Sequence, residues 1–114
     1  MCDSEDEYVK DYKKVLAMFI DAEFTVAIPS NELDDVVSTD KTIIIKHTRS
    51  CYCYGDEPLP TQYFTVECEN HNELTNKYII QELVKQNLRM NCNHVYLEGF
   101  HNLHDNVYET MVGS

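Results

Sequence analysis

The spacing of apolar residues predicts two amphipathic helices. Between residues 8 and 20, apolar side chains recur with helical periodicity, and the lysines fall outside their arc. The apolar positions of this first helix are Tyr8, Val9, Tyr12, Val15, Leu16, Phe19 and Ile20. A second helix is predicted to begin near Asn70 or Asn72, either of which is a good N-cap, and to end near Arg89. Its wide apolar stripe is typical of a helix that lies on a sheet: Leu74, Tyr78, Ile79, Ile80, Leu83, Val84 and Leu88.

Other segments are rich in β-branched residues or alternate between apolar and polar residues, which predicts strands. The predicted strands are residues 24–28, 42–48, 62–68, 94–100 and 107–112. Residues 30–40 are polar and acidic, and they predict a loop or a short helical turn capped by Ser30. Residues 49–61 contain one glycine and two prolines, so we expect an irregular loop there.

This order of elements predicts a single α+β domain over residues 1–114, because the chain is too short for a second core. We expect an antiparallel or mixed sheet of about four to five strands, with two helices packed on one face. Residues 1–6 form an acidic N-terminal segment that we expect to fray.

The net charge is the strongest compositional signal. The chain has 20 acidic residues against 9 Lys and Arg, which gives a formal charge of −11. Nucleic-acid binding needs clustered basic residues, and the only arginines are Arg49 and Arg89, so we expect no nucleic-acid partner. The sign favours a protein partner with a basic face, or mimicry of a polyanion. The alternative is that the acidity only keeps a small protein soluble.

No segment predicts contact with a membrane. The longest apolar runs, such as Ile43–Ile45, are far shorter than the roughly 20 residues that cross a bilayer. The first residues lack a basic region followed by an apolar stretch, so no secretory signal is readable and we expect a cytoplasmic location. We therefore expect the five cysteines to be reduced thiols.

One set of residues suggests zinc. If strands 42–48 and 62–68 form a hairpin, the loop between them and the end of the second helix meet at one end of the sheet. Cys51, Cys53, Cys92 and His94 would share that end and make a tetrahedral Cys₃His set. Structural zinc sites usually space paired cysteines by two residues, whereas one residue separates these pairs, so partly exposed loop thiols are the alternative. Cys68, His101 and His104 are expected at the opposite end.

Two further groups of residues carry side chains that could bind a metal or act in catalysis. His101, His104 and Asp105 have ligand atoms on one turn, although an ordinary surface turn explains them equally well. Cys92, His94 and Glu98 share a face of an extended segment, which gives a cysteine-dependent enzyme as a third reading. Motifs for dinucleotides, P-loop phosphates and zincin metals do not occur, so we expect no organic cofactor.

Aromatic residues favour an interaction surface. Tyr52, Tyr54 and Tyr63 lie in and beside the proline-containing loop, and tyrosines are enriched at protein interfaces. Alternatively, these rings cover the sheet end and support the loop. We also expect self-association, either through a sheet edge or through the face of the 8–20 helix.

The string Asn91-Cys92-Asn93-His94-Val95-Tyr96-Leu97-Glu98-Gly99-Phe100, preceded by the helix Tyr78-Ile79-Ile80-Gln81-Glu82-Leu83, resembles small proteins of giant DNA viruses of amoebae. The resemblance covers roughly residues 62–100 and implies a setting in host cytoplasm, viral factory or virion. It implies no activity or catalytic residue. The sequence therefore predicts an acidic protein-interaction domain without catalysis, which acts as an adaptor, regulator or structural component. The alternative is a small zinc-stabilised binding module.

Overall fold

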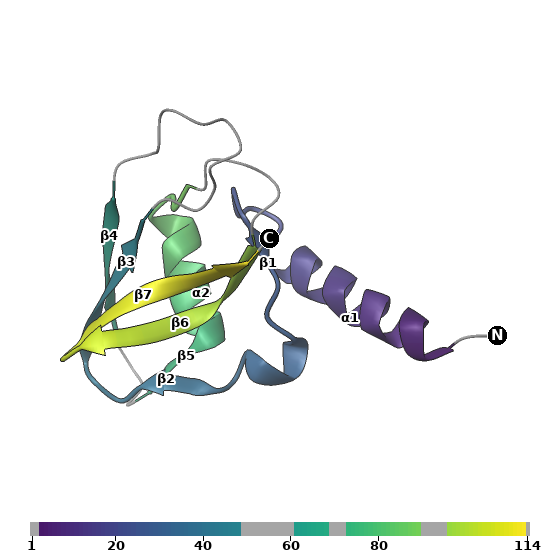
Figure 1. Cartoon of the computed structure of the whole chain (residues 1–114), viewed down its shortest axis with the longest axis horizontal. Coiled ribbons are helices and arrows are strands. Elements are labelled where there is room, and N and C mark those ends of the chain that lie inside the picture. The colour runs from purple at the N-terminus through teal and green to yellow at the C-terminus, as the bar shows by residue number, and fades with distance from the viewer. Residues whose placement is uncertain (1–2, 49–60, 69–72, 90–95, 114) are drawn as a thin grey trace.

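The strands of the protein form one large and one small sheet, with one long helix before the first strand and a second helix before the last two strands (Figure 1). The computed structural model describes residues 3–48, 61–68, 73–89 and 96–113, with the backbone alone for residues 3–8. In chain order the elements are α1 (Asp3–Met18), β1 (Thr25–Val26), the short 3-10 helix η1 (Ser30–Glu32), β2 (Val36–Ser38), β3 (Thr42–His47), β4 (Gln62–Glu67), β5 (Leu74–Thr75), α2 (Asn76–Lys85), β6 (Tyr96–His104) and β7 (Val107–Gly113). The predicted α+β class is confirmed.

The large sheet is mixed, with the strand order β1-β6-β7-β3-β4, and β2 pairs with β5 in the small sheet. The predicted hairpin of β3 and β4 is confirmed: the two strands are antiparallel, from Thr42 opposite Glu67 to His47 opposite Gln62. The β6–β7 pair is also antiparallel, while β3 runs parallel to β7 and β1 runs parallel to β6.

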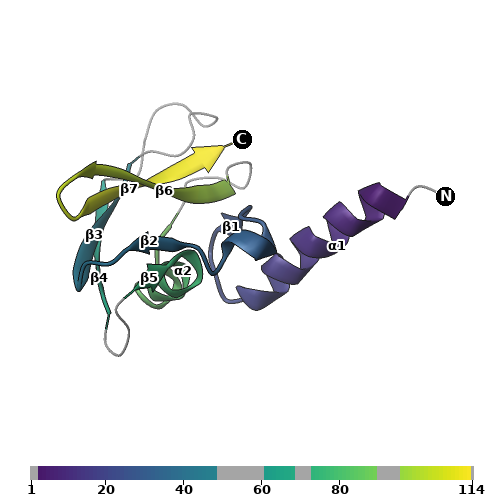
Figure 2. The same ribbon diagram turned by 90° about the horizontal axis from the view of Figure 1, so that it is seen from below.

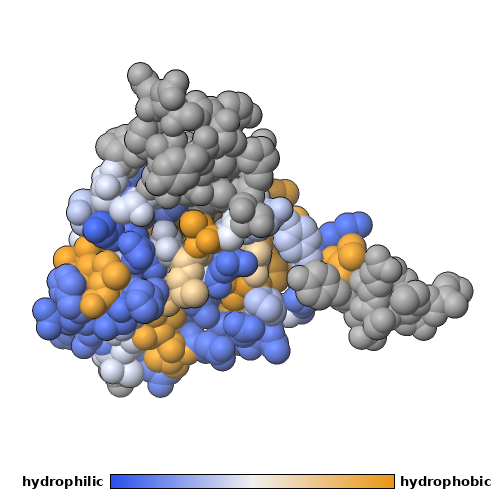
Figure 3. All heavy atoms as spheres, in the orientation of Figure 1, coloured by the Kyte–Doolittle hydropathy of each residue, from blue (hydrophilic) through white to orange (hydrophobic). Residues whose placement is uncertain are grey.

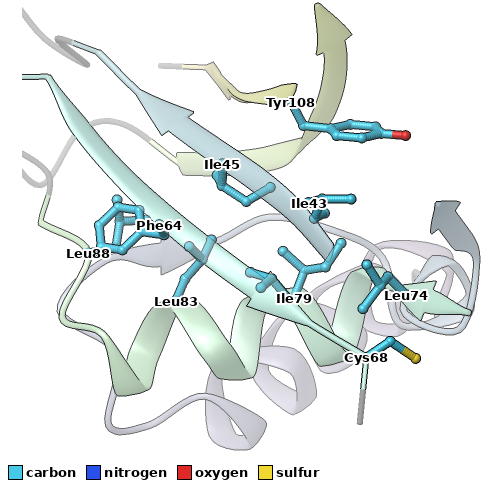
Figure 4. Packing of buried hydrophobic residues seen from close by; sticks show 10 residues of the cluster. Ile43, Ile45, Phe64, Cys68, Leu74, Ile79, Leu83, Leu88 and Tyr108 are labelled. Carbon is cyan, nitrogen blue, oxygen red and sulfur yellow. The ribbon is translucent and has the colours of Figure 1, made fainter. Parts of the chain in front are cut away.

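One face of the large sheet carries the main core because its strands bury every second residue. Ile43 and Ile45 of β3 are fully buried, and they face Ile79 and Leu83 of α2 (Figure 4). Full burial of such a side chain stabilises the fold by roughly 1.5–3 kcal/mol. The wide apolar stripe of α2 therefore holds this helix against the sheet, as the sequence predicted.

Helix α2 is shorter than its sequence pattern, and local hydrogen bonds explain both ends. Thr75 is the N-cap, and its hydroxyl accepts a hydrogen bond from the N–H of Tyr78 at 3.2 Å. At the other end, Asn87 has a φ of 62°, and the N–H of Leu88 donates to the carbonyl of Leu83 at 3.0 Å. This is a Schellman ending, in which Leu88 packs back into the core.

A second cluster joins α1 to the rest of the molecule. Val15 of α1 and Phe19, which follows the helix directly, are buried against apolar residues of four other segments: Val26, Ile28, Leu33, Ile80 and Leu97. Among the described side chains of α1, those near its C-terminal end take part, and the N-terminal half of the helix projects away from the sheets (Figures 1 and 2).

Side chains near and within α2 cover the outer edge of β4. Gln86 Nε2 donates to the carbonyl of Thr65 at 2.8 Å, and Tyr78 Oη donates to the carbonyl of Glu67 at 2.6 Å. Gln62 exchanges two hydrogen bonds with the backbone of Arg89, at 2.9 and 3.2 Å. The opposite edge strand, β1, has two residues. Both edges of the large sheet are therefore short or capped.

Candidate functional site

An open groove of about 510 Å³ lies between the small sheet and the β6–β7 hairpin. One wall comes from η1, β2 and the first residue of α2, and the other comes from β6 and β7. We call it the acidic groove, and its lining residues are Glu32, Val36, Val37, Asn76, Glu98, Gly99, Phe100, Asn102, Tyr108 and Met111.

A β-bulge shapes the wall that β6 supplies. The register between β6 and β7 shifts between Leu97 and Gly99, and Gly99 has a φ of 156°, which side chains other than hydrogen rarely allow. A Cβ at this position would lie 3.8 Å from Met111 Sδ, which is ordinary contact. Glycine is therefore required here by backbone conformation and not by lack of space.

Three hydrogen bonds fix the opposite wall. Tyr108 Oη donates to the carbonyl of Val37 at 3.3 Å and so ties β7 to β2 across the groove. The side chain of Asn76 donates to the carbonyl of Glu32 at 2.8 Å, and its backbone N–H donates to the carbonyl of Asp35 at 3.1 Å. Because both walls are anchored to the core elements, the groove is already formed without a ligand, which lowers the entropy lost on binding.

The lining combines exposed apolar side chains with acids. Val36 is 46% exposed and Met111 is 48% exposed. Among the described lining residues, the charged ones are Glu32 and Glu98, and none is a lysine, arginine or histidine. The apolar surface of this side of the molecule forms separate patches among hydrophilic side chains (Figure 3). Such a groove suits a ligand with a positive charge beside an apolar group.

The residues of the predicted zinc set, Cys51, Cys53, Cys92 and His94, lie outside the described residues, as do Tyr52 and Tyr54. The topological step behind that prediction is confirmed by the described neighbours: Gln62 at the start of β4 bonds to Arg89 beyond α2, so both lie at one end of the sheet. The zinc set itself stays a prediction.

The opposite end of the sheet holds Cys68 and His104 as expected, whereas His101 pairs with Glu109, level with Lys46 toward the other end of β3. Cys68 is buried, its N–H donates to the carbonyl of Lys41 at 2.8 Å, and its thiol donates to the carbonyl of Glu73 at 3.8 Å. The turn after β6 reaches the same end, because the side chain of Asn106 donates to the carbonyl of Thr42 at 3.0 Å.

The histidine turn does not gather into a ligand set. His104 Nδ1 lies 3.5 Å from Asp105 Oδ2, while His101 pairs across the strands with Glu109. Within the parts of the chain that the structure describes, no group of three or more His, Cys, Asp or Glu side chains is placed to hold a metal ion.

Two other predicted residues have clear positions. Tyr63 is 64% exposed on β4, opposite Lys46, on the sheet face away from α2. Glu98 lines the acidic groove, while Cys92 and His94, with which it was grouped as a possible enzyme site, lie outside the described residues. Sequence reasoning missed the groove because its two acids are far apart in the chain and each resembles an ordinary surface charge.

A buried histidine was also missed. His47 is 2% exposed, and its Nδ1 lies 2.7 Å from Thr110 Oγ1 on the neighbouring strand, within hydrogen-bond distance. Burial lowers the pKa of His47 below its ordinary value, because the charged imidazolium loses its hydration. The alternation of β3 places position 47 on the inner face with Ile43 and Ile45, which is the signal that predicts its burial.

No protein-family model matches the chain, and the searches of curated proteins and of solved structures find no match either. Among the described helices, none is long and apolar enough to cross a membrane.

Proposed function

We propose that this protein is an acidic protein-interaction domain that binds a basic segment of a partner polypeptide in the acidic groove. One observation carries the proposal: the groove combines exposed Val36 and Met111 with the carboxylates of Glu32 and Glu98, and none of its described lining residues is a cation. The bound segment would place an apolar side chain against Val36 and Met111, and lysine or arginine beside the two glutamates.

The charge of the whole chain supports the same type of partner. A formal charge of −11 attracts basic polypeptides over long range and repels phosphate backbones. Much of this attraction is between exposed charges, so salt weakens it. Partner binding should therefore fall as ionic strength rises.

The proposed role is binding without catalysis, as an adaptor, regulator or structural component. The groove lining contains amide, carboxylate, thioether and aromatic groups, with no cysteine or histidine among the described lining residues. The proposed setting is the host cytoplasm, a viral factory or a virion, in line with the resemblance of residues 62–100 to giant-virus proteins.

Selection from a phage-displayed library of random peptides tests the proposal. We expect selected peptides to carry lysine or arginine next to an apolar residue. A synthetic copy of one such peptide, titrated by calorimetry, should bind the E32K/E98K double variant at least about tenfold more weakly than the unchanged protein, a loss of about 1.4 kcal/mol.

The matched control is the D21K/E67K double variant. Asp21 and Glu67 are exposed acids that do not line the groove, so this variant makes the same change in net charge without touching the proposed site. Selected peptides that are acidic, or that bind E32K/E98K as tightly as D21K/E67K, would show that the groove is not the binding site.

A further inference from the structure

Half of α1 lies outside the body of the protein and yet keeps its apolar face. The helix has 16 residues, so it is about 24 Å long. Val15 and Phe19 are buried, whereas Val9 is 40% exposed and Tyr12 is 36% exposed on the preceding turns of the same face. A short helix that projects into water is marginally stable by itself, and burial of such a face is its usual source of stability.

The charges of α1 are divided along its length. The first turns carry only acids, namely Asp3, Glu5, Asp6 and Glu7, and the following turns carry Lys10, Lys13 and Lys14. The three lysines are exposed. Asp6 and Lys13 are two helical turns apart, so both positions fall on the same flank of the apolar face.

We propose that α1 pairs with the α1 of a second copy of this chain in an antiparallel arrangement. The two-fold axis would pass near Val9, where the apolar faces meet. This register brings position 6 of each helix level with position 13 of the other, so an acid of one copy stands beside a lysine of the second copy, twice by symmetry.

Three observations favour a second copy as the occupant. When two copies of α1 run in opposite directions, the acids of the first turns in one copy lie beside the lysines of the other. A helix that binds an unrelated partner needs no such self-complementary charge pattern. A hollow of about 440 Å³ lies next to Tyr12, lined also by Ala27, Tyr96 and Glu98, and it can take side chains of a helix that packs beside α1. Self-association through the edges of the large sheet is disfavoured, because side chains cap carbonyls of β4 and because β1 is very short. The paired face of α1 contributes no residue to the acidic groove, although Glu98 lines both that groove and the hollow next to Tyr12.

Sedimentation over a range of protein concentrations and salt concentrations tests this pairing. We expect a dimer whose dissociation constant is about tenfold higher in Asp6→Lys than in the unchanged protein, and about tenfold higher in Lys13→Asp. Each single change puts like charges together at two symmetric places. The D6K/K13D double variant exchanges the two charges and should recover most of the lost affinity. Glu7→Lys and Lys14→Asp make the same charge changes at positions further round the helix from that flank and are the matched controls.

Several outcomes would overturn the pairing. These are a monomer at every concentration, a dimer that Val9→Glu leaves intact, or a double variant no better than the single ones. Circular dichroism of each variant shows whether α1 is kept. The peptide titration at the acidic groove, repeated on V9E, separates the two proposals. Unchanged peptide binding by a monomeric V9E supports both. A V9E variant that remains dimeric counts against the helix pairing alone, and a monomeric V9E that no longer binds the peptide counts against the groove alone.

Discussion

The carboxylate of Asp11 on α1 accepts hydrogen bonds from both the hydroxyl and the backbone N–H of Ser30, the first residue of η1, the latter at 3.1 Å. The side-chain bond from Ser30, followed by the backbone bond, lowers the pKa of Asp11 below its ordinary value of 3.8. Because η1 leads into β2, this contact connects the projecting helix to one wall of the acidic groove.

Asp11→Asn should loosen α1, because the neutral amide is a weaker acceptor at the Ser30 hydroxyl and N–H. We expect faster amide hydrogen exchange in α1 and at Ser30, measured by mass spectrometry or NMR. In the unchanged protein, the lowered pKa means that the contact is fully present above pH 3.8 and is lost as the pH falls below that value. Asp21→Asn, at an exposed position after α1, is the control and should leave exchange unchanged.

His47 should make stability depend on pH. Its pKa is lowered in the folded state, so its contribution is complete above the ordinary value of 6.5 and is lost as the pH falls below it. The free energy of unfolding should then fall by at most about 1.4 kcal/mol per pH unit for this one proton. Urea unfolding from pH 7.5 down to about 5 measures the slope, which His47→Gln should remove and His104→Gln, at an exposed position, should keep. An identical slope in H47Q would contradict this assignment.

Gly99 and Gly113 should respond differently to alanine. Gly99→Ala forces a side chain into a backbone conformation at φ 156° and should destabilise the fold by about 1–3 kcal/mol. At Gly113 a new Cβ would meet the carboxylate of Glu98 at 2.6 Å, but that group is the mobile end of a flexible side chain and can move aside. Urea unfolding of the two variants compares them directly. Equal losses would mean that conformation is not what selects glycine at position 99.

Metal analysis decides whether zinc stabilises the protein. Under the proposed function, we expect a purified sample without stoichiometric zinc and a melting temperature that a chelator does not change. One equivalent of zinc, lost together with cooperative unfolding on chelation, would instead support the predicted set of Cys51, Cys53, Cys92 and His94. Cys68→Ser is the control for a thiol outside that set.

Much of the fold follows from periodicity because the core depends on it. The alternation in β3 and β4 gives the buried face, and the wide stripe of α2 gives the helix that covers it. The ends of α2 were less predictable. Leu74 and Thr75 join a strand pair with β2, so the helix begins after them, and the left-handed backbone of Asn87 ends it before Arg89.

The acidic groove could not be predicted from the sequence because it depends on tertiary geometry. Glu32 and Glu98 come together only through the pairing of β2 with β5 and the bulge in β6. A two-residue strand such as β5 is too short to give a periodic signal. The extension of β6 to His104 was also missed, since its last residues are polar and resemble a turn.

The capped edge of β4 has a consequence for how the protein behaves when it is crowded. Small proteins rich in strands convert to fibrils by adding one chain to the exposed backbone of the next. Gln86 and Tyr78 occupy carbonyls that such growth would use. A chain protected in this way can accumulate to high local abundance and still meet its own copies by helix contact instead of by cross-β stacking.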